Sequence, residues 1–252
     1  MPNDSFSHYY SKRQSAESRP TYVEYALPRG GAAAPDASTA PASVSASADV
    51  THTPYEAPIT KAVSVSASPA VSAPMRLSFV TDSGVFAKSR VDAGSDLLIR
   101  SIPPLRGRAL DFGCGYGVVG ISLARMNPGA DIWFSDVNER AVELCRENYK
   151  RLAPHANAED IRTKIICSDS FAEFGSIIFD SIFLNPPVRA GKAVIYKMYR
   201  DAADHLNADG SLYVVIQKKQ GMKSTFNELL AIFGNCVDIA AKSGYHVLKS
   251  TR

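Results

Sequence analysis

Asp111-Phe112-Gly113-Cys114-Gly115-Tyr116-Gly117-Val118-Val119-Gly120 is the stretch that decides the fold of this chain. It ends a short apolar run, Arg108–Phe112, and leads into Val118–Met126, which has the apolar spacing of a helix. Glycines at such a junction let the backbone turn sharply and let a ligand approach closely, because no Cβ stands in the way. The stretch therefore predicts a strand, a glycine loop with a ligand site, and a helix.

Strands and helices alternate on both sides of this stretch. Strands separated by helices of ten or more residues imply a parallel sheet covered on both faces. The last two expected strands are separated only by Lys242-Ser243-Gly244, so they must form an antiparallel hairpin. The expected fold class is α/β and Rossmann-like, with a seven-stranded mixed sheet that ends in this hairpin. The expected strands of the sheet are 108–112, 131–137, 163–167, 179–184, 210–217, 237–241 and 245–249, and the expected helices are 92–102, 118–126, 139–152, 193–206 and 222–233.

Composition divides the 252 residues into three parts. In residues 32–74, 31 of 43 residues are Ala, Ser, Pro or Thr, which is too little apolar surface to offset the chain entropy of folding. We expect this part to be a disordered linker or insertion. Residues 1–31 form an N-terminal extension, in which 21–27 alternates like an edge strand. Residues 75–252, which open with a strand-like stretch at 76–81, suit a single domain.

The sequence also excludes several classes of protein. No run of 18 apolar residues exists, so we expect no membrane span. The polar N-terminus predicts no secretory signal, so we expect a cytoplasmic protein whose four cysteines are reduced. Those cysteines lack metal-ligand spacing, so we expect no metal site. Residues 75–252 hold 23 Lys and Arg against 19 Asp and Glu, a balance compatible with nucleic acid but not diagnostic of it. The oligomeric state stays open.

The glycine loop alone fits two cofactors. Gly115-x-Gly117-x-x-Gly120 matches the dinucleotide pattern. Asp136, at the end of the second strand of the expected sheet, is placed to accept from ribose hydroxyls, which both NAD and S-adenosylmethionine (SAM) possess. On this evidence NAD, SAM and no cofactor at all remain open.

Two further carboxylates favour SAM. Asp111, just before the glycines, suits the ammonium of a methionine moiety but would repel a pyrophosphate. Asp169, after the third strand, can accept from the adenine amine, and Phe171 offers a surface on which a base could stack. Ligands of open α/β sheets bind at the carboxyl ends of the strands, where these residues lie.

Asn185-Pro186-Pro187 ends the fourth strand of the expected sheet and suggests the reaction. An amine conjugated to a ring is a poor nucleophile whose lone pair must be aimed at the methyl group. The Asn185 amide oxygen can accept one N–H and the Pro186 carbonyl the other, while Pro187 stiffens the turn. We therefore expect methyl transfer to a planar nitrogen, with a simple strand terminator as the alternative.

These stretches together resemble the methyltransferase small domain family, which includes bacterial guanine-N2 methyltransferases of small-subunit ribosomal RNA. The resemblance covers 75–252, and 5–28 loosely. It implies the class I fold of SAM-dependent methyltransferases, with SAM as the cofactor. It also implies N-methylation of an exocyclic amine, guanine N2 in ribosomal RNA above all. The resemblance rests on Thr81–Ala87, Val91–Leu98, Asp111–Gly117 and Asn185–Arg189.

The resemblance implies a role for each site residue. Phe86 lies in a segment that leads into the catalytic pocket. Many amino-methyltransferases have an aromatic residue after Asn-Pro-Pro, where this chain has Val188, so Arg189 is left to stack on the base or bind a phosphate. In the cofactor site, Asp111, Gly113 and Gly115 line the SAM pocket, Asp136 meets the ribose and Asp169 the adenine; in the catalytic site, Asn185, Pro186 and Pro187 hold the amine.

Lys218 and Lys219 follow the fifth strand of the expected sheet, at the edge where the site is expected. They could bind RNA phosphates, or they could belong to a solvated loop. Other open alternatives concern the substrate. Asn-Pro-Pro also serves protein glutamine, normally with Tyr next, which is absent here. Another RNA, or a non-catalytic RNA-binding module with the same fold, also remains possible.

Overall fold

The computed structural model describes residues 18–28, 75–85, 87, 89–153 and 164–252. The chain separates into a unit made of Met1–Ala32 with Pro74–Arg252, and a second unit, Ala33–Ala73. All described residues belong to the first unit. The expected linker or insertion at 32–74 lies outside them.

A seven-stranded sheet in the order β5-β4-β3-β6-β7-β9-β8 forms the centre of the unit. The strands from β5 to β7 pair in parallel, and β9 runs antiparallel to both of its neighbours. This confirms the expected mixed sheet with its C-terminal hairpin. The strands are β3 (Arg108–Phe112), β4 (Asp131–Asp136), β5 (Ile165–Cys167), β6 (Phe179–Leu184), β7 (Leu206–Gln217), β8 (Val237–Lys242) and β9 (Tyr245–Thr251).

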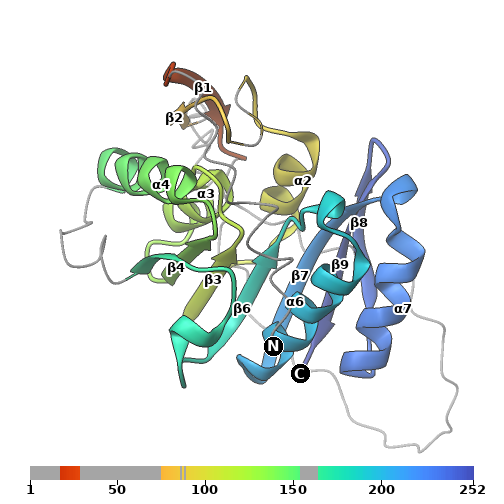
Figure 1. The fold of residues 1–252 in the computed structure, drawn as a ribbon. Helices are drawn as coiled ribbons and strands as arrows, with labels where there is room; N and C mark the ends of the chain where they lie inside the picture. The colour runs from red at the N-terminus through yellow and green to blue at the C-terminus, as the bar shows by residue number, and fades with distance from the viewer. Residues whose placement is uncertain (1–17, 29–74, 86, 88, 154–163) are drawn as a thin grey trace, which may run out of the picture. The chain divides into compact units, whose positions relative to one another are not determined.

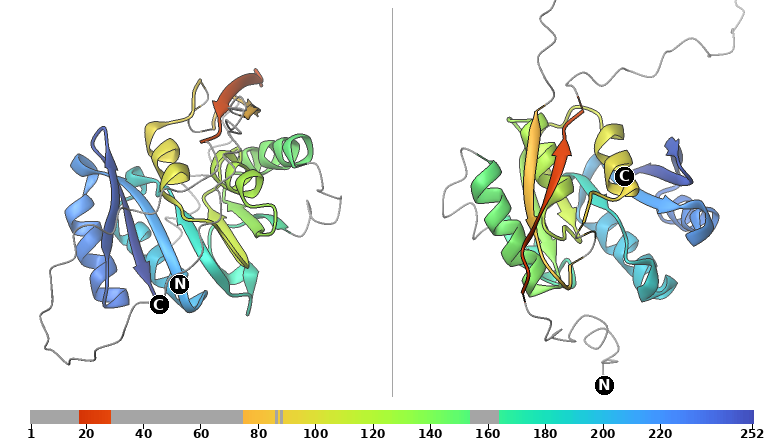
Figure 2. Two further views of the ribbon diagram at one scale, coloured as in Figure 1. Left: turned by 180° about the vertical axis from the view of Figure 1, so that it is seen from behind. Right: turned by 90° about the horizontal axis from the view of Figure 1, so that it is seen from above.

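Helices cover both faces of the sheet (Figures 1 and 2). Ala109 and Phe183 belong to a buried cluster with α2, α3 and α4, whereas their neighbours Leu110 and Leu184 belong to a second cluster with α6 and α7. Successive strand residues therefore face opposite layers, as the strand period of two requires. The helices are α2 (Ala93–Ser101), α3 (Val118–Met126), α4 (Glu139–Leu152), α6 (Lys192–Asp204) and α7 (Met222–Phe233), with short 3₁₀ helices η1 (Ala172–Phe174), η2 (Val188–Ala190) and η3 (Lys218–Gln220).

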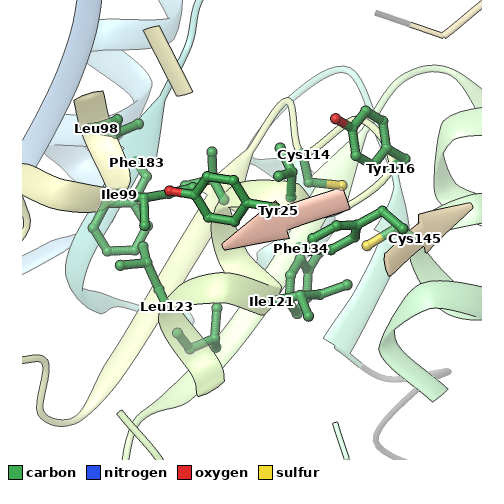
Figure 3. Close-up of a cluster of buried hydrophobic side chains, with 14 of the residues drawn as sticks. Tyr25, Leu98, Ile99, Cys114, Tyr116, Ile121, Leu123, Phe134, Cys145 and Phe183 are labelled. Atoms are coloured by element: carbon green, nitrogen blue, oxygen red, sulfur yellow. The ribbon is translucent and has the colours of Figure 1, made fainter. Parts of the chain in front are cut away.

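Figure 3 shows the first of these clusters. Leu98 and Ile99 of α2 are fully buried, as are Ile121 and Leu123 of α3, and they pack in the same cluster as Phe134 of β4. Burying a side chain of this size contributes about 1.5–3 kcal/mol. The cluster fixes α2 and α3 against the sheet, and both helices begin at the edge where the site is expected.

The N-terminal extension contributes a strand to the same unit. β1 (Thr21–Ala26) pairs antiparallel with β2 (Arg76–Thr81), so two strands some 50 residues apart form a separate two-stranded sheet. The sequence predicts both strands but not their pairing. The backbone N–H and C=O groups of Val80 in β2 both form hydrogen bonds with the side chain of the buried Asn148 on α4. These bonds attach the β1–β2 sheet to the domain.

Local signals explain where the helices begin. Asn138 is the N-cap of α4, because its side chain accepts from the backbone N–H groups of Arg140 and Ala141. Asp92 caps α2 in the same way, through Gly94 and Ser95. No helix among the described residues is long and apolar enough to cross a membrane.

Candidate active site

The site lies where the order of the strands reverses. From β3 the chain proceeds outward to β4 and β5, and then returns to β6 on the other side of β3. Ligands of open α/β sheets bind at such a switch point, beyond the carboxyl ends of the strands. Phe112 pairs with Leu184 of β6 and with Ser135 of β4. The next residue of each strand brings Gly113, Asn185 and Asp136 side by side at this edge.

The glycine loop follows β3 at this point. Gly113 and Gly115 have φ values of 79° and 57°, and a Cβ added at either would meet no atom within 4 Å. Gly120 is different, because its Cβ would lie 2.3 Å from a ring carbon of Phe134. The loop therefore leaves open space over its first two glycines, while Gly120 lets α3 pack closely on β4.

Asp111 is buried beneath the loop. Its side chain is 4% exposed, and Oδ2 accepts from the Gly120 N–H at 2.8 Å. Burial raises the pKa of Asp111 to about 7, and the nearby Asp136 adds to the rise, whereas the Gly120 hydrogen bond opposes it. The carboxyl group is thus only partly ionised near neutral pH when no cation lies beside it.

Asp136 closes the other side of the loop. Its two oxygens accept from Gly115 N–H at 2.8 Å and Asn138 N–H at 2.9 Å. Burial raises the pKa of Asp136, and these backbone hydrogen bonds oppose the rise. These hydrogen bonds hold the carboxylate at the end of β4, beside the glycine loop.

The outcomes for the expected adenine contacts differ. Asp169 is exposed in the loop after β5, at the same edge of the sheet. Phe171 was expected to offer a stacking surface to the adenine, but it is only 2% exposed. Its ring stacks on Phe112 with ring centroids 4.3 Å apart, and the His205 ring lies tilted against it with the two centroids 4.9 Å apart. Such a ring fills the core and offers no open face to a base. Phe86 lies outside the described residues.

Asn185-Pro186-Pro187 follows β6 beside the glycine loop. The Asn185 side chain donates from Nδ2 to Ser95 Oγ at 3.1 Å. The Pro187 carbonyl accepts from Ala190 N–H, which starts η2, whereas no described group donates to the Pro186 carbonyl. The amide oxygen of Asn185 and the carbonyl of Pro186 are thus two acceptors that this turn has available.

The expected basic residues are all exposed at this edge of the sheet. Arg189 lies on η2, and Lys218 and Lys219 lie on η3 at the end of β7. Among the described residues, none of these three forms an ion pair, whereas Lys197 on α6 pairs with Asp201. No group of three or more His, Cys, Asp and Glu side chains in the described part of the chain could hold a metal ion.

Two further residues contribute to the site, although the sequence patterns assign neither of them a role. Asn148 is fully buried and donates to the carbonyl of Tyr116 within the glycine loop, at 2.9 Å. Ser95 contacts Asn185 from α2. A polar residue on the apolar face of α4 was a visible signal for the first, and the Asp92-x-Gly94-Ser95 stretch was one for the second.

Comparisons with known proteins agree with this geometry. A family model, the methyltransferase small domain, matches residues 76–249. The uncharacterised protein YbxB of Bacillus subtilis (strain 168) is 44% identical over 178 residues, which are 69% of this chain and 85% of that protein. The ribosomal RNA small subunit methyltransferase C of Aeromonas hydrophila is 38% identical over 136 residues, which are 52% of this chain and 37% of that enzyme.

Two other enzymes are also similar. The ribosomal RNA large subunit methyltransferase G of Klebsiella pneumoniae (strain 342) is 33% identical over 174 residues, 67% of this chain and 44% of the enzyme. The solved structure of the T. thermophilus 16S rRNA N2 G1207 methyltransferase, in complex with AdoMet and guanosine, has a TM-score of 0.60 at 25% identity. The matched region covers 71% of this chain and 48% of the T. thermophilus chain. The chain thus spans less than half the length of these three enzymes.

The sheet order, the glycine loop at the switch point and the acidic strand ends define a class I SAM-dependent methyltransferase domain. Its cofactor is SAM, which decides between the two cofactors that the glycine pattern left open. The family model spans most of the compact unit, and the chain belongs to the methyltransferase small domain family.

Proposed function

We propose that the protein methylates the exocyclic N2 amine of a guanine in small-subunit ribosomal RNA, in the cytoplasm, with SAM as the methyl donor. The observation that carries the proposal is the strand register. Because Phe112 pairs with Leu184, Asn185-Pro186-Pro187 begins next to the glycine loop at the switch point of the sheet. A cofactor over the loop and an amine at Asn185 would therefore be neighbours.

The residues at the loop fit SAM. The open space over Gly113 and Gly115 would admit a ligand against the backbone. Asp111 would face the methionine ammonium, Asp136 the ribose and Asp169 the adenine amine, with no contribution from Phe171. When bound, SAM supplies an electrophilic methyl group. The buried carboxyl of Asp111 would then hold its ionised form, because a cation beside it offsets the cost of burial.

Asn185 and Pro186 would hold the target amine. The amide oxygen of Asn185 and the carbonyl of Pro186 each accept one N–H, which aims the nitrogen lone pair away from both and stabilises the positive charge that develops on nitrogen. Pro187 restricts the turn between them and η2. No strong base is needed, because the methylated ammonium loses its proton readily to water.

Ribosomal RNA as the substrate is supported by the site's surroundings and by the relatives. Arg189, Lys218 and Lys219 are exposed cations beside the proposed target pocket, where they would bind phosphates. Arg189 can also stack on a base, which would compensate for the missing aromatic residue at Val188. Guanine N2 is supported by the similarity to the T. thermophilus 16S rRNA N2 G1207 methyltransferase, which was solved in complex with AdoMet and guanosine.

A methyl-transfer assay tests the proposal. The full chain is incubated with tritiated SAM and in-vitro transcripts of 16S or 23S ribosomal RNA, as naked RNA and as reconstituted subunits. The RNA is then digested to nucleosides and analysed by mass spectrometry. We expect N2-methylguanosine in 16S RNA or its subunit. The label in 23S RNA alone, in another nucleoside, or in glutamine of a ribosomal protein would overturn the assigned substrate.

Asn185→Ala is the control for chemistry. It should lower kcat by roughly 10²–10³, by analogy with the loss of one oxyanion contact. SAM affinity, measured by calorimetry, should stay unchanged because Asn185 is not assigned to the cofactor. RNA affinity, measured by filter binding, should also survive, because phosphate contacts dominate it. A near-normal kcat would make Asn185 a simple strand terminator.

A further inference from the structure

We infer that Ser95 is a positioning residue that orients the Asn185 amide toward the target amine. The inference rests on the proposed function and deepens it. Its starting point is the hydrogen bond from Asn185 Nδ2 to Ser95 Oγ, 3.1 Å long, which joins residues 90 positions apart in the sequence. Among the described residues, this is the one hydrogen bond that the Asn185 side chain makes.

Ser95 is held rigidly. Its side chain is 4% exposed, and its backbone N–H donates to the N-cap Asp92. On the preceding residue, the Cβ position of Gly94 lies 3.0 Å from the ring of Tyr245 in β9, so the start of α2 packs tightly on the sheet. Leu98, one turn further along α2, is fully buried. The Ser95 hydroxyl therefore has a fixed position relative to the sheet, and so to the end of β6.

The chemistry of an amide makes this contact functionally important. An Asn side chain presents an oxygen that accepts and an NH₂ group that donates, and rotation of the amide by 180° exchanges them. Only the oxygen can accept from the target amine. Because Ser95 takes the NH₂ end, the oxygen is turned away from α2, and a rotated amide would oppose an N–H donor with another. With Ser95 Oγ accepting from Nδ2, the amide is held in the orientation that leaves its oxygen for the target amine.

All three named residues of the Asp92-x-Gly94-Ser95 stretch then help to place the Ser95 hydroxyl beside Asn185. Asp92 fixes the start of α2 through the backbone N–H groups of Gly94 and Ser95. Gly94 has no side chain and so permits the close approach of Tyr245. Ser95 then reaches Asn185 across the sheet edge. In this view α2 is the support for the catalytic amide as well as a cover for the core.

A double-mutant cycle on kcat tests the inference. Ser95→Ala, Asn185→Ala and the double variant are compared with the unaltered protein in the methyl-transfer assay described above. We expect Ser95→Ala to lower kcat about 2- to 13-fold, the range for one hydrogen bond between neutral groups, with unchanged affinities for SAM and RNA. In the Asn185→Ala background the same change should have no further effect, because its target is gone. Ser101→Ala, on the same helix and bonded to Leu97 O, should leave kcat unchanged.

A second readout does not depend on activity. In ¹⁵N NMR spectra, the side-chain NH₂ signals of Asn185, assigned from their loss in Asn185→Ala, should shift in Ser95→Ala but stay in place in Ser101→Ala. Ser95→Thr keeps the hydroxyl and should restore kcat and the signals. Ser95→Cys keeps the volume but weakens the acceptor, and it replaces the alanine variant if that variant does not fold.

The outcomes separate the inference from the proposed function. Equal losses from Ser95→Ala in both backgrounds, or NH₂ signals of Asn185 that do not shift, would overturn the positioning role while leaving Asn185 catalytic. A near-normal kcat in Asn185→Ala would instead overturn the catalytic assignment, and the positioning role with it.

Discussion

Burial changes the acid–base chemistry of Asp111. Its raised pKa, about 7, means that the folded protein binds a proton there more tightly than the unfolded chain does. This group therefore lowers the free energy of unfolding as the pH rises from about 4 to 7, and the loss is complete above 7. Asp111→Asn keeps an acceptor for Gly120 N–H and removes the charge. We expect the variant without SAM to be more stable at pH 8, on the order of 2–4 kcal/mol.

Chemical denaturation between pH 5.5 and 8 checks this prediction. The advantage of Asp111→Asn should shrink as the pH falls, because the unaltered protein then takes up its proton. SAM affinity should fall in the same variant. Asp131→Asn is the matched control: burial alone would raise the pKa of Asp131, but hydrogen bonds from Lys164 and Trp133 lower it, so this variant should be less stable at pH 8. A destabilised Asp111→Asn variant would show that the buried carboxyl is ionised and paired.

At the residue scale, the sequence predicts which side chains reach the strand ends but not where they point. Asp111, Asp136 and Asn185 follow apolar runs and lie at one edge, as expected. Asp111 turns toward Gly120 beneath the loop, and Phe171 turns into the core. Side-chain direction depends on neighbours from distant elements, such as Phe112 and His205 around Phe171, which no local pattern reveals.

At the element scale, helix-ending residues and hydrophobic periodicity explain why the bounds of several helices were predicted correctly. α3, α4 and α7 have the predicted bounds because Pro, Gly and Asn mark their ends and apolar residues recur at helical spacing. β7 was predicted to begin at Gly210 but begins at Leu206, since Asp209 adopts a φ of 65° within the strand, in a stretch that resembles a turn. The β1–β2 pairing was not predicted, because it joins segments separated by residues of an entirely different composition.

Asn148 should be the most sensitive link between elements. It donates to the carbonyls of Val80 and Tyr116 and accepts from Val80 N–H, at 2.7–2.9 Å. Asn148→Ala would leave three buried backbone groups unpaired, so we expect a loss on the order of 2–4 kcal/mol in the free energy of unfolding. SAM affinity should also weaken, since Tyr116 belongs to the glycine loop. Thermal denaturation and calorimetry measure the two effects.

The control for Asn148 is Asn227→Ala on the exposed face of α7, which should change neither quantity. An intact SAM affinity in a destabilised Asn148→Ala protein would mean that the conformation of the glycine loop does not depend on its link to the β1–β2 sheet.

η3 should contribute to RNA binding by charge rather than by shape. Replacing Lys218 and Lys219 with alanine removes two exposed cations that pair with no described carboxylate. If both bind phosphates, the slope of log affinity against log salt should fall in magnitude by about 1.5, while methyl transfer at saturating RNA stays normal. Filter binding from 50 to 200 mM salt measures the slope. Lys197→Ala, whose partner is Asp201, should leave it unchanged; an unchanged slope in the η3 variant would assign that loop to solvent.

At the scale of the whole molecule, sheet topology assembles the site. Residues near positions 113, 136 and 185 come together because β3 is central and its neighbours β4 and β6 run parallel to it. The alternation of strands and helices predicts this edge from sequence. It does not predict that β1 of the N-terminal extension pairs with β2, although this pairing decides what residues 32–74 connect.

Residues 32–74 join two strands that are already paired. β1 and β2 are in register from Thr21 and Thr81 to Ala26 and Arg76, and Leu27 N–H donates to Met75 O at 2.9 Å. The two ends of the intervening chain therefore lie on neighbouring strands, and a short loop can span them. Replacing 32–74 with four Gly and Ser residues reduces the connection from 47 residues to 8. Loop-closure entropy then predicts a gain of about 1.5 kcal/mol in the free energy of unfolding.

The kcat of the shortened protein should stay within a few-fold of the unaltered value, because this composition offers no groups for a site. A scrambled segment of equal length serves as the control and should behave like the unaltered chain in both measurements. A large loss of methyl transfer in the shortened, still folded protein would show that the segment binds a substrate or partner.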